Sequence, residues 1–375
     1  MVRPSDPRAR DTELMGSSSL NLDDLAQLVV RRAVAVTGAD RVVILAREES
    51  AIALVMACAA EVANLGATPQ ILFTAADIEQ RFLRFGEESA IAEPNPIEMQ
   101  ALEWATVCIA IRGSGPAHAG PGISDDRLLR FRGAQGAVSA LRAASTRWII
   151  VRLPDEEMSA VSGLSLPELH SVFLDASVRD WDADGLKWSA TLKYLNQAKE
   201  IRIVGPAVDL RFSTVNRRWL FGDGKINLPD GELYTAPLDG SLSGWVDVSW
   251  PSHFGGVRIA GLRLEFQKGV VSNLTAQEGE AFARSLIAID EGASCVGEIG
   301  FGTNPAIQRP VGDLFFDEKI LGSMHLALGR AYAECGGSNS SMLHWDIVHD
   351  IRDETTVSAD GVVMFANGGW LTTAD

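Results

Sequence analysis

Short apolar runs rich in β-branched residues alternate with helical patterns through the first half of the chain. The runs are predicted to be buried strands, and they span residues 41–46, 70–73, 106–112 and 148–153. The predicted helices span residues 21–38, 51–64, 99–105, 130–144 and 189–198. Strands that are apolar throughout and separated by helices usually pair in parallel, with helices covering both faces of the sheet. The first half therefore predicts an α/β domain built on a parallel sheet.

The pattern changes after about residue 198. Strand-like segments then follow one another, separated by Gly, Pro and Asp, with one helix expected over residues 277–290. These segments begin near residues 200, 210, 245, 257 and 262. We therefore expect three parts: a disordered arm over residues 1–20, an α/β domain over 21–198, and a β-rich catalytic, metal-binding domain over 199–375.

Composition excludes several classes of protein. The formal net charge is −16 and no basic stripe is visible, which argues against a nucleic-acid partner. No run approaches the ~20 apolar residues that a membrane-spanning helix needs. The first 20 residues lack the apolar core of a secretory signal. The four cysteines are widely spaced and form no CxxC pair, so we expect free thiols and a cytoplasmic location.

Potential metal ligands gather in four short segments of the second half. Glu232 lies in Gly231-Glu-Leu-Tyr-Thr-Ala-Pro237, and Glu298 lies in the glycine-rich string from Gly297 to Pro305. The other candidates are His325, Tyr332, His344 and Asp346. Oxygen and nitrogen donors without thiolate suit a hydrolytic divalent metal. His344 and Asp346 are two residues apart, so on a strand they point to the same face.

Each of these residues, taken alone, also has an ordinary structural interpretation. Glu232 could be a solvated acid, His325 a hydrogen-bonded core histidine, and Tyr332 a half-buried aromatic residue. His344 and Asp346 could form a simple hydrogen-bonded pair. Glu298 differs, because an unpaired acid in an apolar string is costly, and this favours a ligand role.

From about residue 201 onward the chain resembles the M29 aminopeptidase family, of the aminopeptidase T type. The matching strings are Asn227 to Pro237, Gly297 to Pro305, Asp317 to Gly329, Gly336 to Ser341, and His344-Trp-Asp346. The resemblance implies a co-catalytic pair of divalent ions (Zn, Co or Mn). It also implies a homodimer and a metal-binding domain separate from the α/β domain. The implied metal ligands are Glu232, Glu298, His325, Tyr332, His344 and Asp346.

The resemblance implies a dinuclear hydrolase, most readily an aminopeptidase that acts on short peptides or a related small amide. Glu298 is the preferred proton carrier and Tyr332 is expected to stabilise the oxyanion, although which glutamate is base and which is ligand stays open. His349, close to the metal segment, is a candidate for supporting the ligands. A rival interpretation rests on a more distant similarity to 2,5-dihydroxypyridine 5,6-dioxygenase. There a single Fe(II) would be held by His325, His344 and Asp346.

Overall fold

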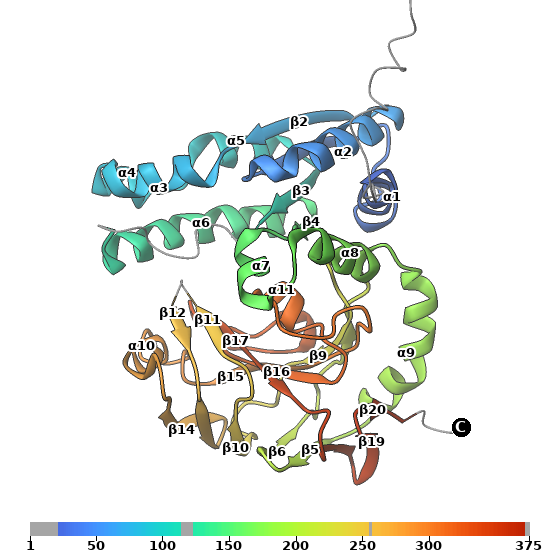
Figure 1. Ribbon diagram of the computed structural model, residues 1–375, viewed down its shortest axis with the longest axis vertical. Helices are drawn as coiled ribbons and strands as arrows, with labels where there is room; N and C mark the ends of the chain where they lie inside the picture. Colours follow the sequence, from blue (N-terminus) through green and yellow to red (C-terminus); the bar gives the residue numbers. More distant parts are fainter. Residues whose placement is uncertain (1–21, 114–122, 255–256, 372–375) are drawn as a thin grey trace, which may run out of the picture.

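The computed structural model describes residues 22–113, 123–254 and 257–371. The arm predicted over residues 1–20 lies outside the described residues. An α/β half lies at the top of Figure 1 and a β-rich half below it, as predicted from the sequence. No helix in the described parts of the chain is long and apolar enough to cross a membrane.

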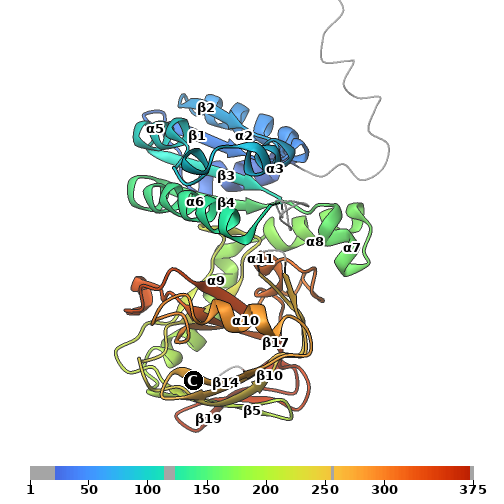
Figure 2. The ribbon, with the colours of Figure 1, turned by 90° about the vertical axis from the view of Figure 1, so that its left-hand side faces the viewer.

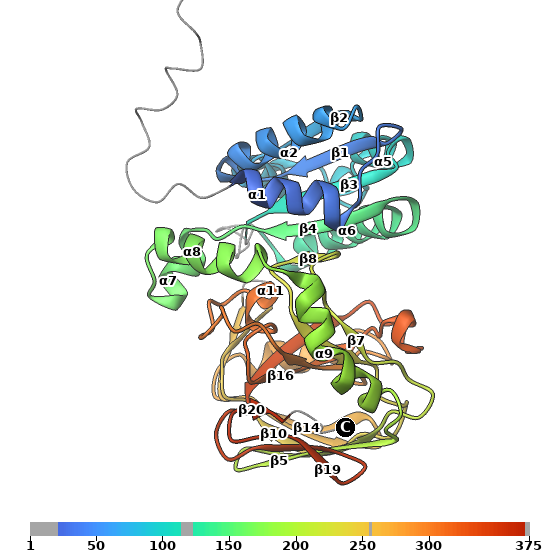
Figure 3. The same ribbon diagram turned by 90° about the vertical axis from the view of Figure 1, so that its right-hand side faces the viewer.

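The first half is built on a five-stranded parallel sheet with the order β2-β1-β3-β4-β8. Its strands are β1 (Arg41–Ala46), β2 (Thr68–Phe73), β3 (Val107–Arg112), β4 (Arg147–Arg152) and β8 (Asn227–Leu228). Alternate residues of the central strands enter two different apolar cores, one on each face of the sheet. Figure 3 shows α1 and α2 over one face, and Figure 2 shows α5 and α6 over the other.

The helices of this half are α1 (Leu22–Gln27), η2 (Leu28–Ala33), η3 (Glu49–Ala51), α2 (Ile52–Asn64), α3 (Ala76–Phe85), α4 (Glu88–Ile91), α5 (Pro96–Trp104), α6 (Asp125–Ser145), α7 (Glu156–Ser162), α8 (Leu166–Ser177) and α9 (Trp181–Leu195). The single helix predicted over residues 21–38 is wrong in detail, because the helical segment ends at Ala33 and its second part, η2, has the wider π-helical turn. That turn makes Val34 buried five positions after Val29, where the α-helical step of four would have placed Ala33.

The second half contains two antiparallel sheets that pack face to face. The larger sheet has the order β14-β13-β10-β6-β5-β18-β19-β20. Its strands are β5 (Glu200–Gly205), β6 (Val208–Ser213), β10 (Ser243–Asp247), β13 (Arg263–Gln267), β14 (Val270–Thr275), β18 (Thr356–Ala359), β19 (Val362–Ala366) and β20 (Gly369–Trp370). In Figure 2 this sheet forms the lowest layer, with β17 above it.

The smaller sheet has the order β17-β16-β15-β9-β7. Its strands are β7 (Leu220–Phe221), β9 (Glu232–Thr235), β15 (Val296–Gly302), β16 (Ser323–Gly329) and β17 (His344–Asp350). The remaining elements are the hairpin strands β11 (Ser252–Phe254) and β12 (Val257–Ile259), and the helices α10 (Glu280–Leu286), α11 (Leu314–Asp317) and η4 (Ala333–Cys335).

A single apolar core fills the space between these two sheets. The smaller sheet contributes Leu233, Ile299, Phe301, Met324, Leu326, Leu328, Trp345 and Ile347 to it. Phe301 stacks on Trp219 and meets Trp370 edge-on, with ring centroids 5.9 and 5.3 Å apart. Because side chains alternate along a strand, one face of the smaller sheet packs in the core. The side chains of the other face do not contribute to this core.

The two halves are joined by more than one crossing of the chain. Strand β8 pairs with β4 in the parallel sheet, although it follows the predicted boundary near residue 198 by almost thirty positions. Phe316 of α11 and Ile320 pack into the core beneath the parallel sheet, and α11 lies between the two halves in Figure 1. The segment that contains α11 therefore lies between the parallel sheet and the smaller sheet, on the side that points away from the core of the second half. The domain boundary near residue 198 stays a prediction.

Candidate metal centre

The face of the smaller sheet opposite the core carries five of the six predicted site residues. Glu232 begins β9, Glu298 lies in β15, His325 in β16, and His344 and Asp346 in β17. Each alternates with a core residue, as in Glu298-Ile299 and Trp345-Asp346. The antiparallel register sets Asp346 opposite Ala327, and Ala327 opposite Glu298, in one row across three strands. The sheet therefore brings together residues that are up to 114 positions apart in the sequence.

Small residues on this face make room for the functional side chains. Gly300 is paired with His325 in the register of β15 and β16. A Cβ atom at Gly300 would lie only 2.3 Å from Cε1 and Nε2 of the His325 ring. Ala327 likewise separates Glu298 from Asp346 by a single methyl group. Gly300 is therefore needed to leave space for the His325 ring above the sheet.

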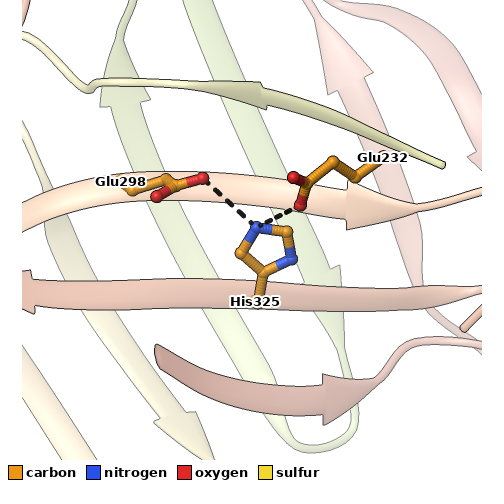
Figure 4. Close-up of side chains that lie close together, drawn as sticks. All are labelled: Glu232, Glu298 and His325. Carbon is orange, nitrogen blue, oxygen red and sulfur yellow. Dashed lines mark ion pairs between the residues drawn. The ribbon is translucent and has the colours of Figure 1, made fainter. Parts of the chain in front are cut away.

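Three buried residues, Glu232, Glu298 and His325, form what we call the inner group. The His325 Nε2 atom lies 3.2 Å from Glu232 Oε2 and 3.5 Å from Glu298 Oε1 (Figure 4). Nε2 of His325 and Oε2 of Glu232 are buried and have no hydrogen-bond partner among the described residues. Buried polar atoms are almost always satisfied, so this convergence of unsatisfied donor atoms is typical of ligands that share one cation.

Three residues, Glu298, His344 and Asp346, form what we call the outer group. The His344 Nε2 atom lies 3.4 Å from Asp346 Oδ2 and 3.6 Å from Glu298 Oε2. The other ring nitrogen of His344, Nδ1, donates to the carbonyl oxygen of Arg330 at 2.8 Å. A proton held on Nδ1 leaves the Nε2 lone pair directed at the carboxylates, which is the arrangement of a metal-binding histidine.

Glu298 belongs to both groups and divides its two oxygens between them. Oε1 faces His325 and Oε2 faces His344. A carboxylate placed in this way can bridge two cations. The inner and outer groups together supply three carboxylates and two imidazoles, which fit divalent ions of the borderline type, such as Zn²⁺, Co²⁺ or Mn²⁺.

Burial of several charges side by side shifts their protonation. Burial raises the pKa of Glu232 to about 8 and that of Asp346 to about 6. Burial lowers the pKa of His325, but the neighbouring carboxylates Glu298 and Glu232 outweigh it and raise the value to about 9. Burial would raise the pKa of Glu298, but His325 and His344 lower it overall. The site without a cation therefore retains protons in positions where a cation could replace them.

Tyr332, the sixth predicted residue, follows β16 and lies at the open side of the outer group. Its ring centroid is 5.3 Å from that of His344 and 5.9 Å from that of Tyr234. Tyr332 is 36% exposed, whereas the residues of the inner group are almost fully buried. The site is therefore open on the side of His344 and Tyr332.

Sequence reasoning missed two residues of this region. Lys319 is completely buried, and its Nζ lies 2.5 Å from Glu232 Oε1 and 2.7 Å from Glu318 Oε1. Tyr234 shares the site face of β9 with Glu232, two residues further along the strand. Lys319 lies inside one of the strings that carry the family resemblance. Its position next to the apolar residues Ile320 and Leu321 was the feature of the sequence that could have indicated a buried lysine.

His349 does not support the ligands as predicted, because it alternates onto the opposite face of β17. Its Nδ1 atom lies 2.8 Å from Ser249 Oγ and accepts from the backbone N–H of the same serine at 3.2 Å. Burial lowers the pKa of His349 to about 4, so the ring is neutral. The odd spacing from His344 already placed His349 on the other face of the strand.

Comparison with known proteins identifies the family of this chain. A family model described as thermophilic metalloprotease (M29) matches residues 18–370. Aminopeptidase T of Thermus aquaticus is 28% identical over 312 residues, covering 70% of this chain and 76% of that protein. Aminopeptidase PepS of Streptococcus thermophilus is 25% identical, covering 72% of this chain and 77% of that protein.

Two solved structures share the fold. Wild-type AmpT from Thermus thermophilus matches with a TM-score of 0.81 at 24% identity, covering 94% of this chain and 99% of that one. A 2,5-dihydroxypyridine dioxygenase from Pseudomonas putida matches with a TM-score of 0.59 at 16% identity, covering 94% and 97%. Both likenesses concern the fold alone, whereas the family model spans almost the entire chain. The chain therefore belongs to the thermophilic metalloprotease (M29) family, and it is an enzyme, a metal-dependent peptidase.

Proposed function

We propose that this enzyme is a dinuclear aminopeptidase that removes N-terminal residues from short peptides or cleaves a related small amide. The curated relatives are aminopeptidases. The observation that carries the dinuclear part is the position of Glu298, whose two oxygens face two different histidines. A site for a single ion does not require a carboxylate that lies between two separate sets of ligands.

In this proposal the inner group holds one divalent ion and the outer group holds the second, with Glu298 common to both. Two such ions, when bound, would lower the pKa of a shared water and polarise the carbonyl of the substrate. Unsatisfied atoms in the inner group and the oriented imidazole of His344 support these ligand assignments. Tyr332 lies beside the outer group and is a further candidate ligand there.

Tyr332 has a second role in the proposal, as a hydrogen-bond donor to the carbonyl oxygen of the substrate. Although the side chain of Tyr332 is partly exposed, the loss of water around its hydroxyl group raises its pKa well above the ordinary value, and the Glu298 and Asp346 carboxylates raise it further. The phenol therefore keeps its proton at neutral pH. A fixed donor beside the carbonyl stabilises the negative charge that develops on its oxygen during hydrolysis.

Glu298 is better suited to the ligand role than to carrying protons. Both of its oxygens face imidazoles, and the lowered pKa keeps the carboxylate ionised. A proton carrier works best with a pKa near the working pH. The earlier expectation that Glu298 shuttles protons stays a prediction, and the bridging role has the stronger support.

The ring-opening dioxygenase has less support as an alternative. It would require His325, His344 and Asp346 around one iron, but among the described residues these three are divided between the inner and outer groups. The dioxygenase likeness extends only to the fold.

We also propose that the enzyme is a cytoplasmic homodimer without a nucleic-acid partner. All four cysteines are free, and three of them are buried. A fully active, stable monomer in light scattering would contradict the dimer.

The proposal is tested by hydrolysis of an aminoacyl-anilide under strict anaerobiosis. Cleavage should continue without oxygen, stop with a chelator, and return with Co²⁺, Zn²⁺ or Mn²⁺. Glu298→Gln keeps the size of the side chain but removes its charge, and it should abolish cleavage and lower the metal content. Oxygen-dependent turnover of a dihydroxypyridine, with no cleavage of any aminoacyl amide, would overturn the proposal.

A further inference from the structure

Lys319 places a fixed positive charge beside only one of the two groups of ligands. Its Nζ atom is completely buried, 2.5 Å from Glu232 Oε1, and 3.8 Å from Asp230 Oδ1. Glu232 thus presents one oxygen to Lys319 and the other to His325. Any cation bound by the inner group would share this carboxylate with the ammonium group.

The position of Lys319 is fixed by its backbone as well as by its ion pairs. Its N–H donates to the carbonyl of Phe316 at 3.0 Å, and its carbonyl accepts from the N–H of Asn304 at 2.9 Å. Phe316 is itself buried in the core beneath the parallel sheet. The backbone of Lys319 is thus held in place, and its fully buried side chain has no exposed position close by.

Glu318 and Asp230 face the same ammonium group, at 2.7 and 3.8 Å, and both partly offset its charge at a distance. The side chain of Glu318 is 15% exposed, so water screens its charge more than that of Lys319. The positive charge of Lys319 therefore still acts on Glu232, the carboxylate nearest to its ammonium group.

The outer group has no comparable neighbour. Among the residues that the structure describes, Asp346 forms no ion pair with a lysine or arginine, and its charged neighbour is His344 at 3.4 Å. Glu298 is common to both groups and cannot distinguish them. Besides its deeper burial, the inner group thus differs from the outer group in its carboxylate, because Glu232 is paired with Lys319 and Asp346 has no such partner among the described residues.

We propose that Lys319 makes the two sites unequal, so that the outer group binds the first divalent ion tightly and the inner group binds the second more weakly. This inference rests on the proposed dinuclear function. The inner ion would then be the one that is lost first on dilution and exchanged most easily. Lys319 acts through Glu232 and is a positioning residue, since it does not touch the substrate.

The test is a calorimetric titration of the metal-free full-length enzyme with Co²⁺, followed in parallel by visible absorption. Two steps are expected, the second weaker by roughly tenfold or more, because a buried charge at this distance is poorly screened. Lys319→Met keeps most of the length of the side chain but removes its charge, and it should bring the two affinities together by tightening the second step. Lys193→Met, at an exposed position on α9, is the matched control and should change neither step.

Two further variants assign the steps. Glu232→Gln should remove the weak step, and Asp346→Asn should remove the tight one. Two unequal steps with an unchanged ratio in Lys319→Met would overturn the inference, and so would an inner group that fills first. Failure to bind a second ion under any condition would instead refute the dinuclear proposal.

A measurement on the wild type covers the case in which Lys319→Met does not fold. Crystals grown with one equivalent of Co²⁺ should show anomalous scattering beside His344 and Asp346. A peak beside Glu232 and His325 instead would contradict the inference without the use of any variant.

Discussion

Gly300→Ala is the substitution that tests the geometry of the site most sharply. The new methyl group would lie 2.3 Å from Cε1 and Nε2 of His325 and 3.1 Å from the carbonyl oxygen of Leu233. An ordinary contact is about 3.5 Å, so the His325 ring must retreat by about 1 Å. The ring is fully buried, and it cannot retreat without disturbing Glu232 or Glu298.

A misplacement of this size is expected to lower kcat/KM by about 100-fold. Overpacking of a buried site should cost about 1–3 kcal/mol of unfolding free energy, so the protein should still fold. Metal content should also fall, because His325 is a proposed ligand. Activity on an aminoacyl-anilide, thermal unfolding and elemental analysis measure the three effects. Gly369→Ala is the matched control, because a Cβ there would meet no atom within 4 Å. Wild-type activity and metal content in Gly300→Ala would refute the reasoning.

Two further predictions concern single groups of the site. Tyr332→Phe should lower kcat about 100-fold, as expected for the loss of one oxyanion donor; unchanged metal content would favour the donor role over the ligand role, and an unaltered kcat would exclude the donor role. The metal-free protein should lose stability as pH rises from 6.5 to 9, because the folded-state pKa of His325 is raised from 6.5 to about 9 and that of Glu232 from 4.5 to about 8. Thermal unfolding with and without Co²⁺ checks this, since bound metal should abolish the decline, and an equal decline in both samples would count against the ligand assignment.

Much of the fold could be predicted because local patterns determine it. The β1 strand was predicted with its observed bounds and β5 with its observed start, and the succession of an α/β half and a β-rich half was confirmed. Helices α3, α7 and α8 were missed. On α3, Ile78 and Phe85 are 60% and 73% exposed, so this helix lacks the buried apolar stripe by which a helix is recognised from its sequence. The π-helical turn of η2 is equally invisible, because it shifts the buried position by only one residue.

The site was predictable in its members but not in its arrangement. His344 and Asp346 could be paired from their spacing, and β17 places both on one face. That Glu298 stands between His325 and His344 depends on the pairing of β15 with β16 and of β16 with β17, which no local pattern specifies. Lys319 was missed for the same reason, since its partner Glu232 is 87 positions away in the sequence.

The central claim is that Glu298 bridges two cations, and metal stoichiometry tests it most directly. Elemental analysis of enzyme saturated with Co²⁺ or Zn²⁺ and freed of excess metal should give two ions per chain. Anomalous diffraction should place them on either side of Glu298, one beside His325 and the other beside His344. One ion per chain at saturation, held by His325, His344 and Asp346 together, would contradict the account.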